Sequence, residues 1–160
     1  MLSMKRDEIG AFLKRHETGI LSTCSEGEAY GIPESFGYRN GRLYLQLAMP
    51  SDSRKREFLA ETETVSFTIC EATSSKDFAS VIIQGTVHQL PHDGKAADLA
   101  LAENDQFPSS EVFPMTEEES IEAYELKAEK ITGRKGPNFE IGTATAEIPV
   151  VANDEEANSE

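Results

Sequence analysis

The sequence predicts one α+β domain in which about six antiparallel strands form a barrel or a heavily bent sheet, with two or three helices at its periphery. Apolar runs of strand length recur through the first 90 residues, and turn signals such as Asn40-Gly41 separate them. A single glycine, Gly85, interrupts the longest run, which is typical of a bulge or of the bends at which barrels turn corners. A chain of 160 residues suits one domain of this kind.

The elements are expected in a simple order. Ser3 can cap a first helix, whose Ile9, Phe12 and Leu13 share one face and which ends before Gly19. Strands are expected at residues 19–24, 29–38, 42–49, 65–70, 78–90 and 124–132, with a second helix at 53–61.

The C-terminal part is expected to be more helical. A helix at 95–103, a proline-containing loop at 107–114 and a capping box at 116–119 precede the last predicted strand. Everything after about Gly133 is expected to be extended or disordered. The sequence therefore predicts a folded domain at residues 1–135 and an acidic tail at 136–160.

The charge of the chain is strongly negative. Lys and Arg number 15 against 29 Asp and Glu, for a formal net charge of −14. This sign disfavours nucleic acid and anionic membranes as partners, because both are bound through basic patches. No apolar run is long enough to span a membrane and no signal peptide is visible, so a cytoplasmic protein is expected. The acidity is explained either by ordinary solubility or by adaptation to a high-salt cytoplasm.

The cysteines and histidines suggest no metal site. Cys24 and Cys70 lie in apolar strand-like segments with no Cys or His at metal spacing, so we expect reduced core residues. The three histidines are scattered and are expected at the surface or at strand ends.

The predicted strand at 29–38 has two very different faces. Its second face carries only small residues, which lets another element or a flat ligand approach the backbone closely. These small residues are Gly31, Pro33, Ser35 and Gly37.

The predicted helix at 53–61 begins with three consecutive cations, Arg54, Lys55 and Arg56, after Ser53. The helix macrodipole disfavours cations in a first turn and favours anions there. One explanation is a phosphate held by the helix N-terminus, the Ser hydroxyl and the basic side chains. The alternative is a solvated turn in which these cations pair with Glu57 and Glu61 along the helix.

These segments resemble the pyridoxamine 5′-phosphate oxidase-like family of flavin-binding split β-barrels. The resemblance covers about residues 8–90, and its most specific piece is Ser53-Arg54-Lys55. The other segments that carry it are residues 19–23, 30–38, 41–46, 65–69 and 78–85.

The resemblance implies a split barrel and a homodimer with FMN in clefts at the subunit interface. Arg54 and Lys55, with Ser53, would hold the FMN phosphate. Glu34, Ser35 and Phe36 would line the edge of the isoalloxazine ring through backbone and short side chains. Leu45 and Gln46 would lie beneath the ring, and Ser80 would reach the cofactor across the dimer.

Departures from the family pattern bear on activity. Family members that oxidise pyridoxamine phosphate carry basic residues where this chain has Gly31 and Phe36, and they end in an Arg-rich segment where this chain is acidic. Gln46 stands where related nitroimidazole-resistance proteins place a His. No catalytic side chain is assigned. We expect a flavin-dependent oxidoreductase of unknown substrate, reduced by NAD(P)H or another two-electron donor, that does not oxidise pyridoxamine phosphate.

Two alternatives to this expectation stay open. The first is a non-enzymatic module that binds or stores flavin or haem, with His88 as a potential haem ligand. The second is a reductase that uses the deazaflavin F420, whose polyglutamate tail would prefer a more basic groove than residues 54–56 offer.

Overall fold

The computed structural model describes residues 1–39, 41–50, 53–91 and 119–141. Within these ranges the chain forms two helices, α1 (Arg6–Lys14) and α2 (Arg54–Glu61). The strands are β1 (Leu2–Ser3), β2 (Thr18–Ser25), β3 (Glu28–Arg39), β4 (Arg42–Pro50), β5 (Val65–Ala72), β6 (Phe78–Gln89) and β7 (Glu119–Lys135).

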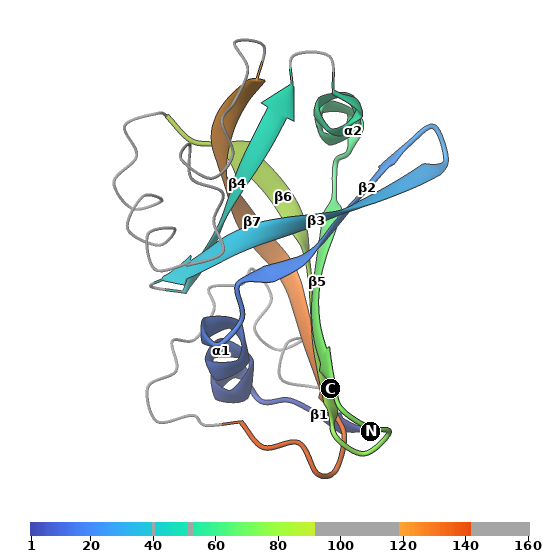
Figure 1. Cartoon of the computed structure of the whole chain (residues 1–160), viewed down its shortest axis with the longest axis vertical. Helices are drawn as coiled ribbons and strands as arrows, with labels where there is room; N and C mark the ends of the chain where they lie inside the picture. The colour runs from blue at the N-terminus through green and yellow to red at the C-terminus, as the bar shows by residue number, and fades with distance from the viewer. Residues whose placement is uncertain (40, 51–52, 92–118, 142–160) are drawn as a thin grey trace.

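The strands close into an antiparallel barrel (Figure 1). Their order is β7-β4-β3-β2-β5-β6, β6 pairs back onto β7, and β1 adds to the far end of β7. The two helices lie at opposite ends of the barrel (Figure 1). The predicted antiparallel split barrel of about six strands with peripheral helices is therefore confirmed.

The barrel is split between β3 and β4. These strands pair only from Phe36–Leu45 to Arg39–Arg42, next to their connecting turn. Beyond it, the first part of β3 pairs with β2, whereas the second part of β4 pairs with β7. Helix α2 lies between β4 and the projecting β2–β3 hairpin (Figure 1). The split and the start of α2 are thus neighbours.

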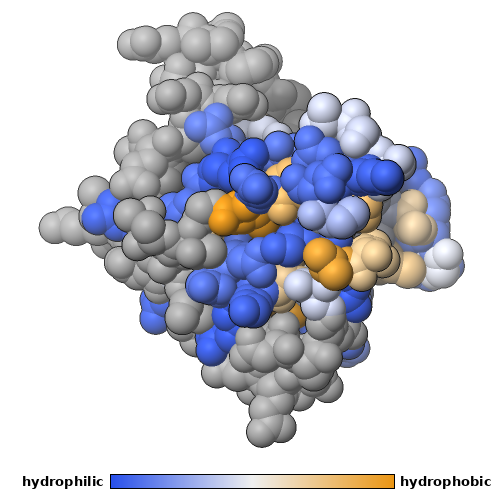
Figure 2. Space-filling view, turned by 90° about the horizontal axis from the view of Figure 1, so that it is seen from below, coloured by the Kyte–Doolittle hydropathy of each residue, from blue (hydrophilic) through white to orange (hydrophobic). Residues whose placement is uncertain are grey.

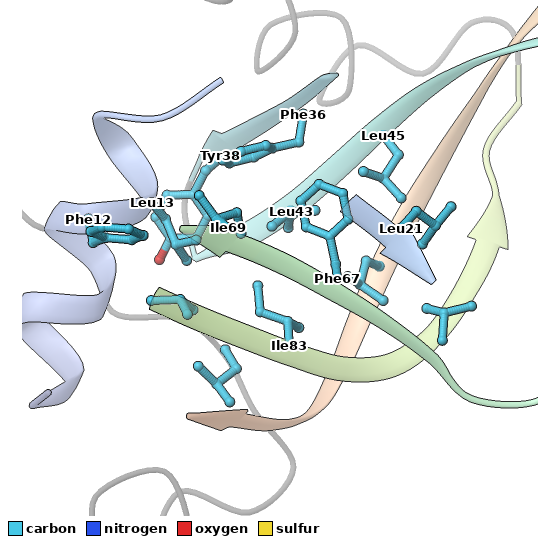
Figure 3. Close-up of a cluster of buried hydrophobic side chains, with 14 of the residues drawn as sticks. Phe12, Leu13, Leu21, Phe36, Tyr38, Leu43, Leu45, Phe67, Ile69 and Ile83 are labelled. Atoms are coloured by element: carbon cyan, nitrogen blue, oxygen red, sulfur yellow. The ribbon is translucent and has the colours of Figure 1, made fainter. Parts of the chain in front are cut away.

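Alternate residues of each strand fill the barrel interior. Phe36 and Phe67 meet edge to face with ring centroids 5.5 Å apart, and Leu21, Leu45 and Ile83 surround them (Figure 3). Helix α1 contributes its predicted apolar face, Ile9, Phe12 and Leu13, to the same core.

The predicted irregularity at Gly85 is present. The register between β6 and β7 shifts between Gln84 and Gly85, which is a β-bulge. A Cβ on Gly85 would lie 2.0 Å from the backbone oxygen of Lys127. Only glycine therefore lets the two strands approach this closely at the bulge.

Three expectations about individual residues were wrong. Ser3 lies in β1, and the helix cap is Lys5, whose backbone N–H donates a hydrogen bond of 3.1 Å to Glu8 Oε1. Cys24 and Cys70 are exposed, free cysteines, because they occupy outward-facing positions of β2 and β5. Their apolar neighbours in the sequence are the residues that point inward.

The end of the folded region also differs from the expectation. Strand β7 runs from Glu119 to Lys135, longer at both ends than the predicted strand at 124–132. Beyond it, Phe139 is buried, and its ring centroid lies 6.2 Å from that of Phe12. The packed structure therefore continues past residue 135. The features predicted at 95–103 and 107–114, most of the capping box at 116–119, and residues 142–160 of the tail lie outside the described residues.

Hydrophilic residues dominate the surface at the end of the barrel where α1 and the N-terminus lie. Figure 2 views this end and shows hydrophobic residues confined to small patches between hydrophilic ones. None of the helices in the described ranges is both long and apolar enough to cross a membrane.

Candidate functional site at the first turn of helix α2

Helix α2 begins because Ser53 caps it. Ser53 has extended backbone angles, and its hydroxyl oxygen accepts a hydrogen bond of 3.1 Å from the backbone N–H of Arg56. The three cations singled out in the sequence therefore occupy the first three helical positions, next to the split between β3 and β4.

Each of these cations is paired with a carboxylate from a strand. The pairs are Arg54–Glu28, Lys55–Glu34 and Arg56–Glu122. Neither sequence-based explanation named these partners. They come from β3 and β7, whereas Glu61 bonds to Ser25. Glu122 lies 66 positions from Arg56 in the chain, so no local spacing rule could have found it.

Arg54 is the most accessible of the three cations. Its side chain is 54% exposed and that of Glu28 is 60% exposed. The guanidinium also lies over the rings of Tyr30 and Phe58, 5.0 and 5.2 Å from their centroids. An exposed pair of this kind contributes little to stability, so the guanidinium can exchange Glu28 for another anion at small cost.

Lys55 bridges the split in the barrel. Its ammonium group lies 2.5 Å from Glu34 Oε1 on β3 and donates a hydrogen bond of 3.2 Å to the backbone oxygen of Ala48 on β4. Burial raises the pKa of Glu34, and the ammonium group of Lys55 opposes that rise. Lys55 thus ties together the two strands that separate at this point.

Arg56 belongs to a network that reaches the buried Glu122 and Tyr124 of β7. Its guanidinium lies 3.0 Å from Glu122 Oε1, and the Tyr124 hydroxyl donates a hydrogen bond of 2.8 Å to Glu122 Oε2. Burial and the negative charge of Glu122 together raise the pKa of Tyr124. The Nε of Arg56 is buried without a hydrogen-bond partner among the described residues.

The residues expected around a flavin ring divide between two faces of the sheet. Glu34 points toward Lys55, while Phe36 and Leu45 are buried in the core, so only their backbone faces the split. Ser35 and Gln46 lie on the outer face and are half-buried.

Ser80 is not brought close to the start of α2 within one chain. It also lies on the outer face, but on β6, which β2 and β5 separate from β3. Three strand spacings, or about 14 Å, therefore separate Ser80 from Ser35.

Comparison with known families gives this arrangement a context. The family model described as pyridoxamine 5′-phosphate oxidase matches residues 5–135, which include every described strand except β1. The chain belongs to this family. An uncharacterized protein of Rhizobium meliloti (strain 1021) is 26% identical over 88 residues, which is 55% of this chain and 56% of the relative. The match thus spans little more than half of that relative.

Solved structures share the fold of the family at low identity. A FAD-binding protein of Mesorhizobium loti superposes with a TM-score of 0.64 at 20% identity, covering 82% of this chain and 93% of that one. A heme binding protein of Mycobacterium smegmatis superposes with a TM-score of 0.63 at 16% identity, covering 86% of this chain and 57% of that one. At these identities the likeness is one of fold.

Proposed function

We propose that this chain binds FMN with its phosphate at the first turn of α2, and that it acts as a flavin-dependent oxidoreductase. The observation that carries the proposal is the half-exposed Arg54 at a capped helix N-terminus beside the split of the barrel. Membership of the family supports a flavin, as does the FAD-binding protein that shares the fold.

The donors at this turn fit a phosphate group. Arg54 can exchange its exposed partner, and the buried Nε of Arg56 offers an unused N–H among the described residues. Among the described residues the hydroxyl of Ser53 donates to Met49 Sδ, 4.0 Å away, so it can turn to a stronger acceptor. The N-terminal end of the helix macrodipole also favours an anion here.

The residues of the split would hold the ring. The backbone of β3 near Phe36 and the outward side chains of Ser35 and Gln46 lie beside the opening between β3 and β4. When bound, the flavin supplies two-electron redox chemistry, and the chain supplies orientation. Gln46 carries no titratable group, so we assign no side chain as acid or base.

We propose further that two copies associate and share the cofactor site. Two copies of a chain with a net charge of −14 repel each other, so they can associate most easily through an uncharged surface. The outward-facing residues of β3, β2, β5 and β6 form such a surface, with Ile20 and Ile82 at its centre, 41% and 39% exposed. We call it the uncharged face, and its residues are Ala29, Gly31, Pro33, Ser35, Thr18, Ile20, Ser22, Cys24, Ser66, Thr68, Cys70, Ser80, Ile82 and Gln84.

Ser80 lies on the uncharged face, so a second copy packed there could bring its Ser80 to the site of the first. Light scattering tests the association. The wild-type chain is expected to be a dimer, Ile82→Glu a monomer, and Leu2→Glu, at an exposed apolar residue of β1 outside this face, a dimer. A monomeric wild-type chain would exclude the shared site.

A visible spectrum and an FMN titration test the cofactor. Flavin absorbance is expected, and Arg54→Ala is expected to weaken FMN binding about tenfold to a hundredfold, the scale of charge-assisted hydrogen bonds. Arg42→Ala is the matched control, because Arg42 is an exposed arginine of β4 that faces Glu125 instead. A protein that takes up no FMN contradicts the proposal, and a Soret band would assign haem instead.

Reduction by NADH or NADPH tests the oxidoreductase activity. Under anaerobic conditions the flavin-loaded protein is expected to bleach with one of them. Pyridoxamine phosphate is not expected to bleach it, because Gly31 and Phe36 provide no cation for the substrate phosphate. A flavin-loaded protein that no donor reduces would be a binding or storage module, and uptake of F420 in preference to FMN would point to a deazaflavin reductase.

A further inference from the structure

Lys55 differs from Arg54 in what a ligand must displace. The Lys55–Glu34 pair is largely buried, since the Lys55 side chain is 18% exposed and that of Glu34 only 8%. Lys55 can therefore be reached from solvent on one side, while Glu34 holds its ammonium group from the other. A phosphate at this turn and the Glu34 carboxylate need the same donor.

We propose that Glu34 is an internal competitor of the cofactor phosphate for Lys55. The inference rests on the proposed function, because it concerns the same phosphate site. When Lys55 turns its ammonium group toward a phosphate, the Glu34 carboxylate is left buried without a counter-charge. A buried carboxylate without a partner is costly, so Glu34 takes up a proton from solvent as the ion pair breaks.

Lys55 is the charged group that opposes the effect of burial on Glu34, through a hydrogen bond and its positive charge. On β2 its pairing partner is Gly19, which has no side chain. On β4 the backbone oxygen of Ala48 accepts a hydrogen bond from Lys55. The raised pKa of Glu34 favours its protonated form, which is the form that proton uptake produces.

Two consequences follow for flavin affinity. The affinity for FMN falls as the pH rises through the raised pKa of Glu34, because the ionised Glu34 competes better. The phosphate itself loses its second proton near pH 6, which strengthens binding as the pH rises. The two effects have opposite signs, so a falling affinity cannot come from the ligand. Riboflavin, which lacks the phosphate, should show no pH dependence of this kind.

Calorimetric titration at pH 8 in two buffers of different ionisation enthalpy measures the proton uptake. The wild-type chain is expected to take up protons with FMN but not with riboflavin. Glu34→Gln should abolish the uptake and bind FMN about tenfold more tightly, since the competing charge is gone. Glu71→Gln is the control, because Glu71 on β5 pairs with Arg15 away from α2, and this variant should behave like the wild type.

The outcomes separate the two proposals. FMN binding without proton uptake, or with equal affinity in Glu34→Gln, overturns the competition while the flavin site stands. Equal affinity for FMN and riboflavin overturns it as well. Failure of every flavin to bind removes both proposals together. The wild-type measurement needs no variant, so a Glu34→Gln chain that fails to fold does not remove the test.

Discussion

Replacing Glu122 by Ala tests whether the first turn of α2 is anchored by its buried pair. Glu122 is 11% exposed at its side chain, and it holds both Arg56 and the Tyr124 hydroxyl. Removing it leaves the Tyr124 O–H without an acceptor, at a cost of about 1–3 kcal/mol. Loss of the ion pair with Arg56 lowers the stability by less than loss of a fully buried pair would. The reason is that Arg56 is 39% exposed and water can reach it. We expect a total loss of about 3 kcal/mol.

Urea unfolding followed by far-ultraviolet circular dichroism measures this loss, since the chain has no Trp. Glu28→Ala is the matched control, because it removes the exposed carboxylate that pairs with Arg54, and it should cost no more than about 0.5–1 kcal/mol. A double-mutant cycle with Tyr124→Phe should give a coupling of about 1–2 kcal/mol. Equal losses for Glu122→Ala and Glu28→Ala would refute the assignment of the buried network as the anchor.

Four further expectations follow from single features of the fold. Gly85→Ala should cost about 3 kcal/mol in the same unfolding assay, because its methyl group meets a backbone oxygen that cannot move without breaking the ladder; a loss below about 0.5 kcal/mol would contradict the bulge. In a spectrophotometric titration, Tyr124 should ionise above the ordinary range of a tyrosine. Since its folded pKa is raised, its contribution to stability is complete below about pH 10 and is lost above it; ionisation of Tyr124 in the ordinary range would contradict its burial. Phe139→Ala should cost about 3–4 kcal/mol if residues after β7 belong to the core, and an unchanged stability would assign them to the tail. Both Cys24 and Cys70 should react with a thiol reagent in the native state, and protection of either would contradict its outward position.

Most of the local structure could be predicted from the sequence. The β3–β4 turn, the start of α2 at about Ser53 and the irregularity at Gly85 depend on residues that are neighbours in the chain, and each prediction is confirmed. The position of Ser3 was not predicted, because it depends on a contact between distant parts of the chain. Ser3 was assigned by its capping propensity, but β1 pairs with the distant end of β7, and that pairing is not visible locally.

Burial was harder to predict than secondary structure. Cys24 and Cys70 lie in apolar runs and yet point outward, because alternation along a strand decides the face and the local apolar content does not. Phe139 falls within the tail that the sequence predicts for residues 136–160, but its burial and its contact with Phe12 place it in the core.

The candidate site also combines features that are local in the sequence with contacts that only the fold creates. The sequence by itself determined that three cations begin α2 and that they need anions there, because charge and helix position are local properties. Only the tertiary structure decided which anions these are. Closure of the barrel brings Glu28 and Glu34 of β3 and Glu122 of β7 to one helix turn, and contacts between strands so distant in the chain follow no local spacing.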